Sequence, residues 1–184
     1  MKPLVNLLTA AVMVLCAFGA GAAVTPEEQF YSPKTAFTWG ADAGASIDMT
    51  GNDMSTVDFD IYFGMRRRWI EFLGVGVGAD IMVTNSCRSF PLYAAFRTNF
   101  VNRPTIAFMD VRIGASLNYL EHNHQQTGLS GFAGVGFNLA RGRRFSSHIL
   151  VGYTYRERRH ISSPEMEHDF GSLSCATVKI GVVF

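Results

Sequence analysis

The carboxy-terminal stretch, residues 170–184, reads FGSLSCATVKIGVVF. Going back from Phe184 to Ala176, every second residue is apolar, whereas the alternate positions include Gly181, Lys179 and Thr177. A period of two with one apolar face is typical of a β-strand. A long apolar strand at the end of a chain invites edge-to-edge aggregation unless its edge is paired. We therefore expect this last strand to pair with the first one and close a barrel.

Seven earlier segments show the same alternation and are separated by residues that favour turns. The predicted strands are residues 35–49, 57–65, 73–83, 92–100, 107–119, 129–139, 145–156 and 170–184. This pattern predicts an all-β fold, an eight-stranded antiparallel up-and-down transmembrane β-barrel, and the even strand number suits a bacterial barrel. Short turns are predicted at residues 66–68, 102–104 and 141–144, and mostly longer loops at the other connections.

The contents of the two faces indicate which one lies outside. No position on the apolar parity is charged. The side chains at these positions are too numerous to fit inside an eight-stranded barrel, so they must point outward. The other parity holds many glycines and a few charges, as expected of a crowded lumen. Its charged or titratable residues are Asp42, Asp48, Asp58, Asp60, Asp80, Asp110, Arg97, Arg112, Arg156, Lys179 and His148. Buried charges need partners, so we expect ion pairs, with Lys179 beside Asp42 or another interior aspartate.

Aromatic residues occur on both the inward and the outward parity of the predicted strands. The inward parity points Tyr62, Tyr93, Phe108, Phe132 and Arg112 into the lumen, so we expect a closed barrel without a conducting pore. The outward aromatic residues fall near strand ends, as the girdles of membrane barrels do. They are Trp39, Phe63, Phe100, Phe145 and Phe184 at one end, and Tyr119, Tyr153, Tyr155 and Phe170 at the other.

The amino-terminal segment predicts export. Residues 1–22 combine Lys2, an apolar run and an A-x-A site at residues 20–22, as in a cleaved secretory signal peptide. Residues 23–34 then form a short periplasmic leader, and residues 35–184 form the barrel. No later apolar run reaches about 18 residues, so no membrane helix is expected. The net charge of +1 gives no field that would attract nucleic acid.

Two cysteines remain after the signal peptide, Cys87 and Cys175. In an oxidising compartment they can form a disulfide. Their separation along the chain does not fix their distance in space, and a disulfide needs close approach of the two residues. Two buried thiols are therefore the preferred prediction, and the disulfide stays open.

From residue 35 to its end, the chain resembles the small eight-stranded outer-membrane barrels of the OmpA/OmpX type. Val178, Ile180, Val182 and Phe184 are similar to the carboxy-terminal signature that the outer-membrane assembly machinery recognises. Residues 74–83 (GVGVGADIMV), 91–100 (PLYAAFRTNF) and 131–140 (GFAGVGFNLA) look like strands of "outer membrane protein beta-barrel domain" proteins. The resemblance implies a monomer in the bacterial outer membrane, with lipids, including lipopolysaccharide, and the assembly machinery as partners.

An enzyme is one alternative. His160 and Ser162 are similar to the His-x-Ser pair of lipid A deacylases, in which a base and a nucleophilic serine act with a carboxylate. The position of that carboxylate is occupied here by Ser174, which departs from the family pattern. The substitutes nearby, none of which matches the pattern, are Glu165, Glu167 and Asp169. We therefore predict no catalytic residues.

Other charged clusters predict surface contacts at most. Residues 121–124 (EHNH) include metal-binding residue types, but no second cluster completes a site, so no metal or cofactor is expected. The basic residues Arg156, Arg158, Arg159 and His160 would face lipopolysaccharide phosphates. The basic turns at residues 66–68 and 141–144 would meet anionic lipid of the inner leaflet.

These observations together predict a non-enzymatic barrel that contributes to envelope structure or to surface interactions. Two alternatives remain open. One is the lipid A-modifying hydrolase, and the other is a secreted, soluble, lipocalin-like binder of an apolar ligand.

Overall fold

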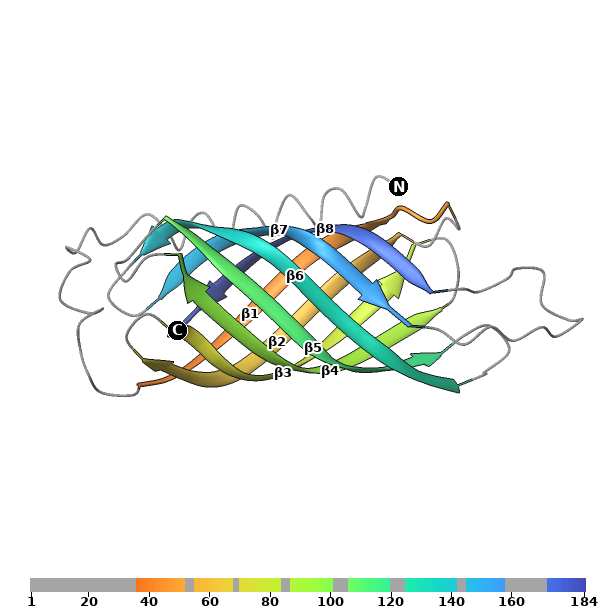
Figure 1. Cartoon of the computed structure of the whole chain (residues 1–184), viewed down its shortest axis with the longest axis horizontal. Coiled ribbons are helices and arrows are strands. Elements are labelled where there is room, and N and C mark those ends of the chain that lie inside the picture. The colour runs from red at the N-terminus through yellow and green to blue at the C-terminus, as the bar shows by residue number, and fades with distance from the viewer. Residues whose placement is uncertain are drawn as a thin grey trace, which may run out of the picture.

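The structure, a computed structural model, describes residues 36–51, 55–67, 70–83, 87–100, 106–119, 125–141, 145–157 and 172–184. They form eight strands that wrap around one axis (Figure 1). The strands are β1 (Ala36–Asp48), β2 (Thr56–Arg67), β3 (Ile70–Met82), β4 (Arg88–Asn99), β5 (Ala107–Tyr119), β6 (Gln125–Arg141), β7 (Ser146–Arg156) and β8 (Leu173–Val183). The predicted signal peptide and leader lie outside the described residues. In the described ranges no helix is long and apolar enough to cross a membrane.

The strands pair in chain order and form a closed barrel. Each neighbouring pair is antiparallel, and β1 also pairs with β8, so that Ala43 lies opposite Ile180. Beyond the last ladder pair, Phe184 and Trp39 exchange two backbone hydrogen bonds of 2.8 and 3.2 Å. Their rings stack with centroids 4.6 Å apart. The predicted eight-stranded antiparallel up-and-down barrel, closed by its first and last strands, is confirmed.

Several predicted strand ends were wrong. The tight turn predicted at residues 102–104 lies outside the described residues. The strand β6 begins at Gln125, inside a predicted loop, because Gln125 to Gly128 pair through their backbones with Ser116 to Tyr119. Arg66 and Arg67 belong to β2 and not to a turn. Backbone pairing therefore continues past the apolar pattern. The connections at residues 49–55, 83–87 and 120–124 have seven, five and five residues, and the connection at residues 157–172 has sixteen.

The two ends of the barrel are named here by their connections. The loop end carries the connections β1–β2, β3–β4, β5–β6 and β7–β8, and the turn end carries the other connections together with Ala36 and Phe184.

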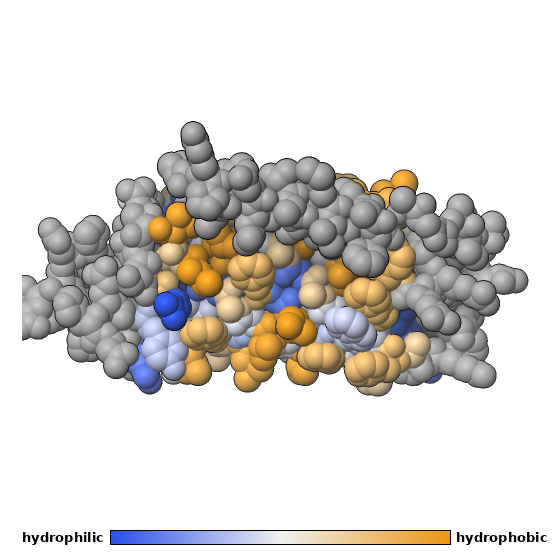
Figure 2. All heavy atoms as spheres, turned by 180° about the vertical axis from the view of Figure 1, so that it is seen from behind, coloured by the Kyte–Doolittle hydropathy of each residue, from blue (hydrophilic) through white to orange (hydrophobic). Residues whose placement is uncertain are grey.

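The outer face of the barrel is apolar. Leu92, Val75 and Ile113 are 61%, 60% and 62% exposed, respectively. Figure 2 shows many hydrophobic residues, in orange, on the coloured part of one face. Residues between them, such as Asp58 and Asp80, are buried. The predicted parity is confirmed, and the apolar side chains point away from the lumen.

Interior aromatic rings lie over glycines of the neighbouring strand. Phe108 pairs with Gly136, and a Cβ atom at Gly136 would lie 2.1 Å from the Phe108 ring. Tyr62 pairs with Gly40 in the same way, with a distance of 2.6 Å. Packing this tight leaves no room for a methyl group without a shift. Glycine on the inward parity therefore makes space for large rings inside a narrow barrel.

Candidate functional site

The centre of the lumen is a buried ionic network around Arg112 on β5. Its Nε lies 2.9 Å from Asp110 Oδ1 and its Nη1 lies 3.2 Å from Asp60 Oδ2. Its Nη2 contacts Asp42. Arg97 donates to Asp110 Oδ2 from Nε at 2.9 Å and from Nη2 at 2.7 Å. Every one of these side chains is nearly fully buried, and each carboxylate has a cationic partner, as burial requires.

A second group of pairs lies nearer the loop end. Lys179 Nζ on β8 is 2.6 Å from Asp60 Oδ2 and 4.0 Å from Asp58 Oδ2. Arg156 Nη2 on β7 is 2.7 Å from Asp80 Oδ2 and 3.5 Å from Asp58 Oδ1. Asp58 also accepts hydrogen bonds from two nearby hydroxyl groups. The partner of Lys179 is thus Asp60, not Asp42.

Asp42 is the meeting point of several strands. Besides Arg112, it contacts His148 Nε2 at 3.1 Å and accepts a hydrogen bond of 2.9 Å from the Tyr62 hydroxyl. The His148 ring also meets the edge of Phe108, with centroids 5.6 Å apart. These contacts connect β1 to β2, β5 and β7, so Asp42 ties opposite walls of the barrel together.

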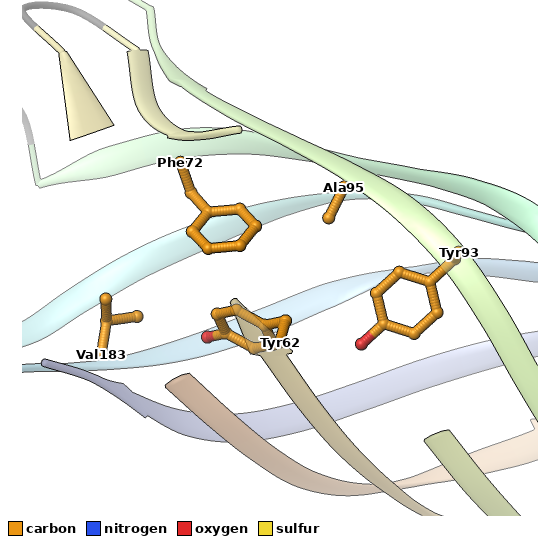
Figure 3. Packing of buried hydrophobic residues seen from close by; sticks show 5 residues of the cluster. All are labelled: Tyr62, Phe72, Tyr93, Ala95 and Val183. Atoms are coloured by element: carbon orange, nitrogen blue, oxygen red, sulfur yellow. The ribbon is translucent and has the colours of Figure 1, made fainter. Parts of the chain in front are cut away.

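Two apolar clusters flank the ionic network. Near the turn end, Phe72 lies beside Tyr62, with Tyr93, Ala95 and Val183 around them (Figure 3). The cluster at the loop end, here called the loop-end cluster, consists of Met82, Cys87, Leu173 and Cys175. Apolar side chains therefore occupy the lumen on both sides of the charges.

Cys87 and Cys175 are both fully buried in the loop-end cluster. No disulfide joins them in the structure. The preferred prediction, two buried thiols, agrees with this arrangement.

The residues weighed above as alternatives for catalysis and metal binding fall mostly outside the described residues. Those outside are His160, Ser162, Glu165, Glu167, Asp169 and residues 121–124. Ser174, at the position of the missing acid, lies on the outer face and accepts a hydrogen bond of 2.7 Å from Tyr153. Within the described strands, no group of three or more metal-binding side chains comes together.

The basic cluster predicted to face lipopolysaccharide needs a correction. Arg156 was expected to face lipid phosphates, but it is 2% exposed and points into the lumen. Its position on the inward parity of β7 places it beside Asp58 and Asp80. Arg158, Arg159 and His160 lie outside the described residues.

No family model and no curated protein matches the chain. Several solved structures are similar to the chain. One is Neisserial surface protein A (NspA), which is 15% identical in sequence to this chain. The alignment covers 82% of this chain and 97% of the NspA chain, with a TM-score of 0.47. Another is the de novo designed protein TMB2.3, which is 14% identical in sequence. The alignment covers 80% of this chain and 92% of the TMB2.3 chain, with a TM-score of 0.31.

These likenesses assign no family. At such identities and scores, neither structure says what this chain does. The resemblance to OmpA/OmpX-type barrels stays a prediction, and the function has to be argued from the surface and lumen of the protein itself.

The sequence prediction missed Glu71 and Phe72 among the lumen residues. Both are nearly fully buried, but the predicted third strand began only at Leu73. Phe72 continues the inward parity of Gly74 and Gly76, so extending the alternation by one step would have found it. Glu71 has no such signal because β3 shifts its register against β4 between Ile70 and Phe72.

Proposed function

We propose that this chain is an integral barrel of the bacterial outer membrane, exported with a cleaved signal peptide. The observation that carries the proposal is the arrangement of its two faces. The outer face is apolar while the lumen holds the charges, which is the reverse of a soluble protein. An exposed apolar surface that runs around a barrel is what a lipid bilayer covers.

The distribution of aromatic side chains supports the same proposal. Trp39, Phe63 and Phe184 are exposed on the outer face toward the turn end, and Tyr153 is exposed toward the loop end. Aromatic rings prefer the two membrane–water interfaces. A turn end in the periplasm and a loop end outside the cell would match this arrangement.

We further propose a non-enzymatic role with a closed, ion-paired lumen, in envelope structure or in surface interaction. The described ion pairs and apolar clusters support closure of the lumen. Outer-membrane lipids, including lipopolysaccharide, and the barrel assembly machinery are the proposed partners. No observation in the described residues favours the lipid A hydrolase, and the filled lumen does not favour a lipocalin-like binder.

Electrophoretic mobility tests the membrane proposal. Purified protein refolded in lipid vesicles should migrate faster unheated than after boiling, and the native protein should fractionate with outer membranes. A protein that stays in the soluble fraction and shows no heat-dependent shift would contradict a membrane barrel.

Two further measurements test the proposals that the lumen is closed and that the protein is not an enzyme. In a planar bilayer the pure protein should give no large, stable single-channel currents. Mass spectrometry of lipid A from cells with and without the protein should show the same acylation pattern. Steady currents would contradict the closed lumen, and a changed acyl pattern would instead favour the hydrolase.

A further inference from the structure

One buried arginine in the lumen has two nitrogen donors without a hydrogen-bond acceptor among the described residues. Arg156 is 2% exposed, and its Nη2 is the atom that contacts Asp80 and Asp58. Its Nε and Nη1 have no hydrogen-bond partner in the part of the chain that the structure describes. Leaving a buried donor unsatisfied costs about 1–3 kcal/mol, and more when the group is charged. A hydrogen-bond acceptor is therefore expected beside these two atoms.

Arg156 also lines a small cavity between the ion pairs. The cavity has a volume of about 20 Å³, and Asp60, Asp80, Ser130 and Thr154 are among the residues around it. A buried water molecule needs about 10–15 Å³ of such space and two to four polar partners. The cavity is thus large enough for one or two water molecules and too small for an organic ligand.

We infer that this cavity is a binding site for one or two ordered water molecules that accept hydrogen bonds from Arg156 Nε and Nη1. The loop-end cluster of Met82, Cys87, Leu173 and Cys175 lies where β3 ends and β8 begins, on the loop side of these charges. An apolar layer there slows exchange with the solvent.

A chloride ion is the other small acceptor that fits this chemistry, and the charges argue against it. Among the described ion-paired side chains of the lumen, five are aspartates and four are arginine or lysine. A bound anion would add to an excess of negative charge in a site of low dielectric constant. Neutral water satisfies the same donors without that cost.

Nuclear magnetic resonance of the full chain in perdeuterated detergent micelles tests the inference. The arginine Nε–Hε groups are assigned through bonds from the backbone, and cross-relaxation with the water signal is then measured. We expect a cross-peak between Arg156 Hε and long-lived water. Arg97 and Arg112 are matched controls in the same lumen, because each Nε donates to Asp110 at 2.9 Å, and both should give no such peak.

A second experiment, with bromide, tests whether the cavity holds an anion instead of water. Crystals of the same protein are soaked in sodium bromide, and anomalous density is searched beside Arg156. The expected result is no bromide in the cavity. The inference is overturned by bromide density there, by the absence of a water cross-peak at Arg156, or by equal water cross-peaks at all three arginines, which would mean a generally hydrated lumen.

Discussion

At the scale of single residues, the inward glycines set how closely rings and backbones approach. Gly136 lies under the Phe108 ring, and Phe108 is fully buried below Arg97, whose guanidinium carbon is 4.7 Å from the ring centre. The ring therefore has little freedom to move aside. At Gly131, on the same strand but the outward parity, an added Cβ atom would lie 3.7 Å from the nearest atom, a backbone carbonyl oxygen.

This contrast gives a matched pair of substitutions on β6. Gly136→Ala should lower the free energy of unfolding by about 1–3 kcal/mol, because the added methyl group overpacks the lumen. Gly131→Ala should leave stability unchanged or raise it by up to about 1 kcal/mol, because alanine restricts the unfolded chain. Urea unfolding in vesicles measures both, and equal effects would contradict the packing described for Phe108.

The two arginines at the centre of the network, Arg112 and Arg97, differ in the number of carboxylates with which they form ion pairs. Arg112 contacts three carboxylates, whereas the ion pair of Arg97 is with Asp110, which Arg112 also holds. Arg112→Met should therefore cost about 3–5 kcal/mol of stability, as expected when buried charges lose their partner. Arg97→Met should cost clearly less. Unfolding curves that place both variants at the same midpoint would show that Arg112 is not the centre of the network.

At the scale of strands, the seam between β1 and β8 depends on the last residue. Deleting Phe184 removes two backbone hydrogen bonds to Trp39, each worth about 0.5–1.5 kcal/mol, together with the ring stack. Phe184→Leu keeps the backbone bonds and loses the stack, worth about 0.5–1.5 kcal/mol.

The deletion should therefore lower the folded fraction on unheated gels after refolding more than the leucine variant does. Both variants are compared with the wild-type chain at the same lipid ratio. If the leucine variant lost as much folded protein as the deletion, the ring and not the backbone pairing would hold the seam.

The strands also show what the amino-acid pattern could and could not predict. Alternation along each segment predicted the barrel, its closure and the inward side chains such as Tyr62 and Phe108. It could not say that Lys179 meets Asp60, since that depends on the register of β8 across the barrel and on how far each side chain reaches. Polar residues such as Gln125 gave no strand signal, because there the pairing is made by the backbone. The bulge near Ile70 likewise left Glu71 unrecognised.

At the scale of the whole molecule, the outer surface distinguishes a membrane protein from a soluble barrel. Leu92 lies near the middle of β4 and is 61% exposed, whereas Phe37 is 71% exposed at the turn end of β1. In a bilayer, Leu92→Arg should cost about 2–4 kcal/mol and Phe37→Arg about 0–1 kcal/mol, because the cost depends on depth.

Unfolding titrations in vesicles measure these two costs. For a barrel surrounded by water, exposed substitutions would both stay within about 0.5 kcal/mol. A penalty at Leu92 that does not exceed the one at Phe37 would contradict the proposed position of the bilayer.

The placement of lumen charges along the chain has a consequence for how the protein reaches its final form. Most of the paired acids, Asp42, Asp58, Asp60 and Asp80, come from β1 to β3, and their cations come from β5, β7 and β8. The aspartates of β1 to β3 and the cations of β5, β7 and β8 therefore lack their partners until these strands come together. A partly assembled sheet would carry unpaired charges that favour contact with water. Removal of water from the interior must therefore wait until the two halves meet, which makes closure a single cooperative event late in folding.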